Sequence, residues 1–177
     1  MPALDRATAL LLVVDFQARL MPAIDQGEAA VANARRLLDA AALFEVPALF
    51  TEQNPAGLGT TVPELAPDPD RVFAKMTFDA ARSPGFLDRV AADRQVVVAG
   101  CEAHVCVLQT VLGLLDAGRR VWVVRDAVGA RRAESKEAAL DRMARHGAEI
   151  VTAEMVVFEW LQSAEHPRFR EALRLIR

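Results

Sequence analysis

Short apolar runs alternate with amphipathic segments along the chain, as in a strand–helix repeat. The first buried strand is predicted at residues 9–14 and ends at Asp15. From Glu28 to Phe44, apolar residues recur every three or four positions, which is typical of a helix with one buried face. Further strands are predicted at residues 48–51, 71–74, 95–99, 120–124 and 149–152, and further helices open at Pro84 and near Cys106 and cover residues 134–146 and the C-terminal end.

The predicted strands are nearly continuous runs of Val, Leu and Ile, which is typical of a parallel sheet covered on both faces. The pattern therefore predicts a three-layer α/β/α sandwich with a six-stranded, mostly parallel sheet, in one domain over residues 1–177. A stretch rich in Gly and Pro, residues 54–70, is expected to form a long surface loop. Loops of this length are usually functional.

Composition narrows the class of protein. The chain has 177 residues, of which 53% are hydrophobic, and a net charge of −3, which fits one domain with a sizeable core. Without a clustered basic face, no nucleic acid or anionic membrane is expected as a partner. The first residues lack the order of a signal peptide, and no apolar run is long enough to span a bilayer. We therefore expect a cytoplasmic protein.

Three of the predicted strands are followed by side chains that can do chemistry. Asp15 follows the first strand, Lys75 the third, and Cys106 follows the fourth after a short loop. In an open parallel sheet, ligands bind beyond the carboxyl ends of the strands. We therefore expect a base, a cation and a nucleophile to converge on one cleft.

The two cysteines lie five residues apart and are interpreted differently. Cys106 stands where strand gives way to helix, and the free N–H groups and dipole of a helix N-terminus favour a thiolate there. It is interpreted as a functional thiol, the alternative being an inert residue at the helix start. Cys101 continues the buried strand and is interpreted as a small core residue. On a strand and the helix after it, the two make a poor structural disulfide.

Lys75 stands out because only two of the 21 basic residues are lysines, the other being Lys136. Arginine is the default cation of this chain, so a lysine at a strand end indicates that a compact ammonium is needed. Asp15 follows six apolar residues, where an unpaired carboxylate is costly, and Lys75 is its candidate partner. The alternative for Asp15 is a helix cap. Asp126, after the fifth strand, is interpreted as a turn or cap residue.

Four motifs follow one another along the chain. They are Val13-Val14-Asp15-Phe16-Gln17, Thr51-Glu52-Gln53-Asn54-Pro55, Phe73-Ala74-Lys75-Met76-Thr77-Phe78 and Gly100-Cys101-Glu102-Ala103-His104-Val105-Cys106-Val107. In this order they resemble one family, the isochorismatase-like cysteine hydrolases, over nearly the whole chain. Within that family the chain is most similar to the isochorismatase domain-containing proteins, which it also resembles at residues 154–160 and 166–169.

The resemblance implies a triad in which Cys106 attacks an electrophilic carbon, Asp15 takes the thiol proton and Lys75 stabilises the charges. It also implies a cis peptide bond between Cys101 and Glu102, and an oxyanion hole made by the backbone N–H groups of Glu102 and Cys106. The implied reaction is acyl transfer from an amide or related carbonyl compound to Cys106, followed by hydrolysis. This route differs from that of true isochorismatases, which by family analogy dispense with the thiol.

The chain differs from some members of this family at a metal-binding site. Nicotinamidases carry an aspartate-and-histidine metal site after the second strand, but here that region contains Glu52, Gln53 and Asn54. We therefore expect no metal and no cofactor, and nicotinamide is a poor candidate substrate. A dinucleotide is also disfavoured, because the first strand is not followed by a glycine-rich turn.

A small, partly apolar cavity is expected beside the strand ends. For each candidate in its lining, contact with a small-molecule substrate and ordinary packing both stay open; for His104 the alternative is a structural hydrogen bond in its loop. The candidate substrate-binding residues are Phe16, Gln17, Gln53, Phe78, His104 and Val105.

Two other functions stay open, a binding or scaffold protein that keeps the fold, and a redox sensor at Cys106. The C-terminal segment has more apolar surface than a small pair of helices needs, including Phe158, Trp160 and Phe169. We therefore expect self-association into a homo-oligomer.

Overall fold

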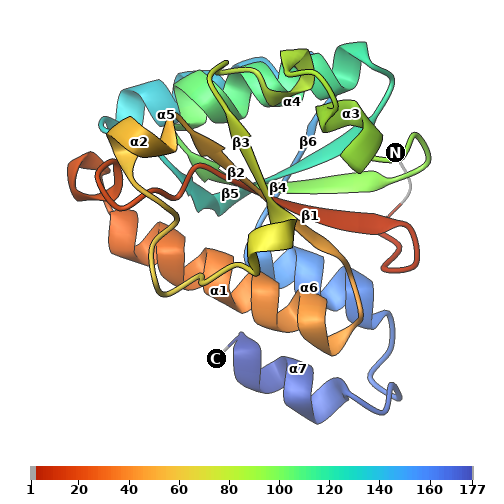
Figure 1. Ribbon diagram of the computed structural model, residues 1–177. Coiled ribbons are helices and arrows are strands. Elements are labelled where there is room, and N and C mark those ends of the chain that lie inside the picture. The colour runs from red at the N-terminus through yellow and green to blue at the C-terminus, as the bar shows by residue number, and fades with distance from the viewer. Residues whose placement is uncertain (1–2, 177) are drawn as a thin grey trace.

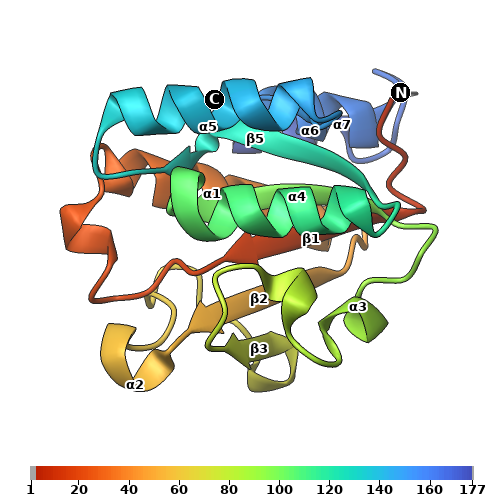
Figure 2. The ribbon, with the colours of Figure 1, turned by 90° about the horizontal axis from the view of Figure 1, so that it is seen from above.

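The computed structural model describes residues 3–176, and its centre is a six-stranded sheet. The strands are Ala9–Val14 (β1), Ala48–Gln53 (β2), Val72–Lys75 (β3), Gln95–Cys101 (β4), Arg120–Gly129 (β5) and Glu149–Val151 (β6). Their order across the sheet is β3-β2-β1-β4-β5-β6, and each neighbouring pair is parallel. Figure 2 shows this order from β3 at one edge through β2 and β1. All these strands therefore present their carboxyl ends at the same edge of the sheet.

Helices cover both faces of the sheet. They are Gly27–Leu43 (α1), Pro55–Leu58 (α2), Phe86–Arg89 (α3), Leu108–Asp116 (α4), Ala133–Arg145 (α5), Ala153–Leu161 (α6) and Phe169–Leu175 (α7). In Figure 1, α1, α6 and α7 lie below the sheet, whereas α3, α4 and α5 lie above it. The predicted three-layer α/β/α fold is confirmed. No helix in residues 3–176 is both long enough and apolar enough to cross a membrane.

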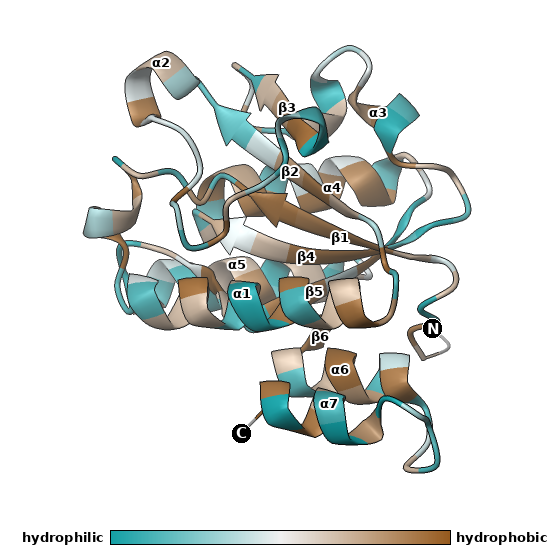
Figure 3. Ribbon diagram, turned by 60° about the horizontal axis from the view of Figure 1, so that its bottom comes forward, coloured by the Kyte–Doolittle hydropathy of each residue, from teal (hydrophilic) through white to brown (hydrophobic). Residues whose placement is uncertain are grey.

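Two hydrophobic clusters lie on opposite faces of the sheet, as the alternation of side chains along a strand requires. On β1, Leu11 and Val13 point into the cluster beneath α1 and α6, whereas Leu10, Leu12 and Val14 belong to the cluster beneath α4 and α5. Both β1 and β4 are buried along their whole length. Figure 3 shows these central strands as apolar. Burial on both faces is why their sequences show no polar alternation.

The sequence pattern located most elements to within one or two residues. The larger differences lie at the edge of the sheet where the strands have their carboxyl ends. β5 runs on to Gly129, because a register shift between Val98 and Gly100 lets it continue pairing with β4. Asp126 thus lies within a strand rather than after it. The helix expected near Cys106 begins only at Leu108, after one turn of π-helix over Ala103–Val107.

The loop between β2 and β3 is tied to the end of β1. It contains the single helical turn α2, and an isolated bridge joins Gln17 to Thr61. Gln17 is buried, and its side-chain amide donates to the carbonyl oxygens of Gln53 and Gly59 at 3.0 and 2.6 Å. These contacts therefore hold the loop between β2 and β3 beside the carboxyl ends of the strands.

Candidate active site

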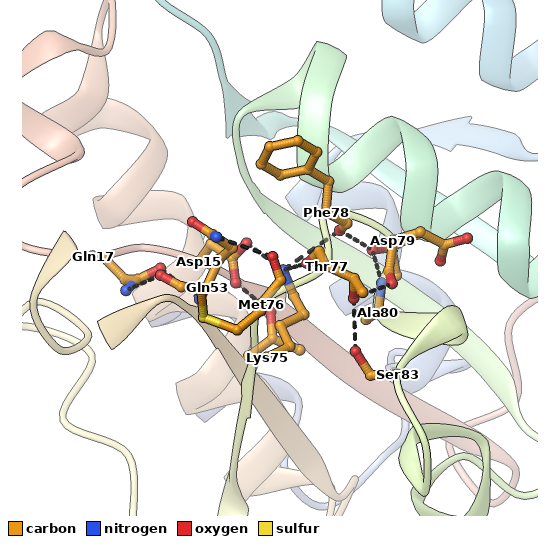
Figure 4. Close-up of polar contacts among 12 residues, drawn as sticks. Asp15, Gln17, Gln53, Lys75, Met76, Thr77, Phe78, Asp79, Ala80 and Ser83 are labelled. Carbon is orange, nitrogen blue, oxygen red and sulfur yellow. Dashed lines mark hydrogen bonds and ion pairs between the residues drawn. The ribbon is translucent and has the colours of Figure 1, made fainter. Parts of the chain in front are cut away.

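Asp15 and Lys75 form a buried ion pair across the carboxyl ends of neighbouring strands. Asp15 follows β1 and Lys75 ends β3, so the pair reaches across β2. Lys75 Nζ lies 2.8 Å from Asp15 Oδ2, and both side chains have an exposure of 0%. The expected pairing of this carboxylate with this ammonium is confirmed (Figure 4).

Neighbouring groups form further hydrogen bonds with both members of the ion pair. Thr51 Oγ1 donates to Asp15 Oδ1 at 2.6 Å. The Lys75 ammonium also donates to the carbonyl oxygens of Thr77 and Phe78 at 3.2 and 3.4 Å. These hydrogen bonds offset the cost of burying two charges. Sequence reasoning missed Thr51, whose only signal is a hydroxyl at the end of an otherwise apolar predicted strand.

Cys106 lies in the π-helical turn after β4, and the Asp15 carboxylate is near enough to act on the pKa of its thiol. The residue is 7% exposed. Burial raises the pKa of the Cys106 thiol well above its usual range, and the negative charge of Asp15 raises it further, whereas Lys75 lowers it. At rest, burial and the charge of Asp15 both favour the neutral thiol over the thiolate that the sequence led us to expect. The arrangement instead suits proton transfer from the thiol to Asp15 during attack.

Glu102 begins the turn that carries Cys106. Its peptide bond with Cys101 is cis, and its carbonyl oxygen accepts hydrogen bonds from the backbone N–H groups of Val105 and Val107 at 3.0 and 3.2 Å. The Glu102 carboxylate accepts from Arg131 Nε at 2.9 Å and from the Arg131 N–H at 3.3 Å. Glu102 is therefore held at both its backbone and its side chain.

Two of the candidate substrate-binding residues point into the fold instead. Phe16 has an exposure of 0% and belongs to the hydrophobic cluster beneath α1, on the opposite face of the sheet from Cys106. Gln17 is also fully buried, and its side chain is used in the loop contacts described above and in accepting from the Gln53 N–H at 2.8 Å. Both side chains thus take part in packing or loop contacts, because the chain after β1 turns inward.

The other four candidates lie nearer the surface. Phe78 is 51% exposed and follows Lys75 by three residues. Gln53 Nε2 donates to the carbonyl oxygen of Met76 at 3.1 Å. His104 and Val105 are half-buried in the turn of Cys106, and His104 Nδ1 is buried without a partner among the described residues. Figure 4 shows Gln53, Lys75 and Phe78 around the end of the site.

Cys101 and Asp126 have structural roles. Cys101 has an exposure of 0% within the core, and burial raises the pKa of its thiol to about 12. Asp126 Oδ1 accepts from the N–H of Ala153 at 2.9 Å, at the first residue of α6. The interpretation of Cys101 as a core residue is confirmed. Asp126 is not in a turn after the strand; it lies within β5 and accepts from the first N–H of α6, whose N-cap residue is Thr152.

The segment at the end of β2, which contains Glu52 and Gln53, makes a structural contact. Glu52 Oε1 accepts from the N–H and the hydroxyl of Thr61 at 2.7 and 2.8 Å. Within residues 3–176, no group of three or more His, Cys, Asp or Glu side chains is placed to hold a metal ion.

Comparison with known proteins decides the family. The family model of the isochorismatase domain matches residues 9–155, which is most of the chain. The chain belongs to the isochorismatase family. It is similar to the human isochorismatase domain-containing protein 2, with 38% identity over 180 residues that cover 99% of this chain and 88% of the human protein. The predicted resemblance is therefore confirmed, and the family and fold support a hydrolase.

Solved structures of the same fold carry varied names. The MAR1 ribonuclease of Caenorhabditis elegans has a TM-score of 0.91 and 34% identity, covering 99% of this chain and 92% of its own. The Escherichia coli YcaC product, described as an octameric hydrolase of unknown specificity, has a TM-score of 0.89 and 28% identity over 99% of this chain and 90% of its own. Pseudomonas aeruginosa YcaC, solved with covalent acrylamide, has a TM-score of 0.88 and 29% identity over 98% of this chain and 91% of its own.

Proposed function

We propose that this isochorismatase-family protein is a cysteine hydrolase that cleaves the C–N bond of a small amide or a related carbonyl compound. The observation that carries the proposal is the meeting of Asp15, Lys75 and Cys106 at the ends of β1, β3 and β4. Asp15 is bonded to Lys75 at 2.8 Å, and the same carboxylate faces the Cys106 thiol. A base beside a thiol and an ammonium beside the base are the parts that nucleophilic catalysis needs.

The first half of the proposed reaction forms an acyl-enzyme. Asp15 takes the thiol proton while the Cys106 sulfur bonds to the substrate carbonyl carbon. The carbonyl π electrons move to oxygen, where the backbone N–H groups of Glu102 and Cys106 stabilise the oxyanion. When the oxyanion collapses, the C–N bond breaks, the nitrogen takes the proton from Asp15, and the amine leaves.

The second half releases the acid. Asp15 takes a proton from water as the water oxygen bonds to the thioester carbon. Collapse of this second tetrahedral intermediate breaks the C–S bond, and the sulfur takes the proton back from Asp15. The products are a carboxylic acid and the regenerated thiol. Throughout, Lys75 offsets the charge on Asp15, and no metal or cofactor takes part.

The Pseudomonas relative with covalent acrylamide supports a reactive nucleophile in this fold. Close to Lys75 in the chain, Phe78 is 51% exposed and Met76 is 69% exposed. We assign these two residues to the opening through which substrate enters, together with Gln53, His104 and Val105. The name of the Caenorhabditis elegans relative raises RNA cleavage as a competing activity. Against RNA stand the net charge of −3 and a nucleophile that is only 7% exposed.

The test is intact-mass measurement after incubation with a panel of small amides and acyl esters, acrylamide, and a single-stranded RNA. We expect an acyl adduct on Cys106 and release of acid and amine. The Cys106→Ser variant should lose the adduct, whereas Cys101→Ala, a matched control at the buried cysteine, should keep it. Reversible oxidation of Cys106 without an acyl adduct would favour the redox sensor. No modification at all would favour the scaffold protein. RNA cleavage without an adduct would favour the ribonuclease.

We also propose that the protein assembles with copies of itself through the outer face of α6. Met155 and Phe158 lie three residues apart on this helix and are 45% and 41% exposed. The Escherichia coli relative is octameric, which supports self-assembly in this fold. Light scattering at micromolar concentration should show an oligomer that the double variant Met155→Glu/Phe158→Glu reduces in size. A strict monomer would overturn the proposal.

A further inference from the structure

Thr51 contacts Asp15 at two points, one on its backbone and one on its carboxylate. The residue lies on β2 directly beside the end of β1, where Val14 is its register partner. Its carbonyl oxygen accepts from the Asp15 N–H at 3.1 Å, and its hydroxyl donates to Asp15 Oδ1 at 2.6 Å. Thr51 is 1% exposed and Asp15 is 0% exposed, so water does not compete for this hydrogen bond. The contact is therefore short, dry and directed at one oxygen.

The hydroxyl and the ammonium divide the two carboxylate oxygens between them. Thr51 bonds to Oδ1 and Lys75 bonds to Oδ2, both within 2.8 Å. Two donors on different oxygens fix the rotation of the carboxylate about its bond to Cβ. The Cys106 thiol faces the same carboxylate. With Lys75 alone, the plane of the carboxylate could turn about the remaining contact, and its alignment with the sulfur would be lost.

A second threonine makes a similar contact outside the site. Thr61 Oγ1 donates to Glu52 Oε1 at 2.8 Å, and both residues are buried, with 8% and 7% exposure. Neither side chain has a hydrogen bond to the side chain of Asp15, Lys75 or Cys106 among the described contacts. The chain thus offers two buried threonine–carboxylate pairs, only one of which includes the proposed base.

We infer that Thr51 is a positioning residue for the proposed hydrolysis, acting through Asp15 by aiming its carboxylate at the Cys106 thiol. The inference rests on the proposed function, since it assigns Thr51 to the same proton transfer. A misplacement of about 1 Å can slow a reaction about a hundredfold, so a carboxylate freed from the hydroxyl should slow thiol activation about ten- to a hundredfold.

The experiment measures the rate at which iodoacetamide alkylates Cys106 in the full-length protein, followed by intact mass. A haloacetamide needs no knowledge of the natural substrate. Thr51→Val removes the hydroxyl and keeps the shape of the side chain, and Thr51→Ser keeps the hydroxyl. Thr61→Val is the matched control. Thermal unfolding is recorded for each variant, and Thr51→Ala replaces Thr51→Val if the latter does not fold.

We expect Thr51→Val to react at least about tenfold more slowly than the natural chain, with Thr51→Ser and Thr61→Val within about threefold of it. Equal rates for Thr51→Val and the natural chain would overturn the inference and leave the proposed function standing. Equal loss in Thr51→Val and Thr51→Ser would also overturn it, because the effect would then come from packing. A natural chain that is unreactive at Cys106 would remove the proposed function itself, and the role of Thr51 with it.

Discussion

Replacing Lys75 by Met should destabilise the fold sharply, because it leaves the Asp15 carboxylate buried beside an uncharged side chain. Two opposite unit charges 2.8 Å apart attract by about 6 kcal/mol at an effective dielectric constant near 20. Removing one partner of a buried pair costs about 3–5 kcal/mol, since the other charge is left without compensation. We therefore expect Lys75→Met to lower the free energy of unfolding by about 3–5 kcal/mol.

The assay is urea unfolding followed by circular dichroism at neutral pH, with two companion variants. Asp15→Asn/Lys75→Met removes both charges and should recover at least half of the loss. Lys136→Met changes the other lysine of the chain, which makes no salt bridge within residues 3–176, and should cost no more than about 0.5 kcal/mol. A loss below about 1 kcal/mol for Lys75→Met, or a double variant no more stable than the single one, would show that the ion pair does not stabilise the fold in this way.

Three further results are expected. Burial raises the pKa of Cys101 from 9.0 to about 12, so its contribution to stability is complete below pH 9.0 and is lost as the pH rises. Urea unfolding should show a decline of about 1.4 kcal/mol per pH unit from this thiol, which Cys101→Ala removes; an unchanged slope would contradict it. Gly100→Ala would place a Cβ 2.5 Å from the Val14 carbonyl oxygen. Thermal unfolding should show a loss of stability of about 3 kcal/mol, and unchanged stability would show that β1 shifts to make room for the methyl group. Gln17→Leu leaves the backbone groups of Gln53 and Gly59 without hydrogen-bond partners. The free energy of unfolding should fall by about 2–3 kcal/mol, and the loop after β2 should be cut faster by a protease; unchanged stability would show that water replaces the amide.

Local sequence pattern predicted the layers of the fold and the edge of the sheet that carries the site. The helical period between residues 28 and 44 and the continuous apolar runs are local properties, and they located α1 and the two central strands closely. Because strands joined by helices run parallel, the residues after strands one and three had to share one edge. The pairing of Asp15 with Lys75 followed from the cost of an isolated buried carboxylate.

Features that depend on residues distant in the chain could be seen only once the elements were packed together. Thr51 lies 36 residues from Asp15, and only the register of β2 beside β1 places its hydroxyl on the carboxylate. The inward course of Phe16 and Gln17 follows from the left-handed conformation of Asp15, with φ of 49°, and from the loop packed against them. The raised pKa of Cys106 is a matter of burial and of a charge brought from another strand. Local pattern encodes which element forms, whereas burial and electrostatics are set by the elements packed around it.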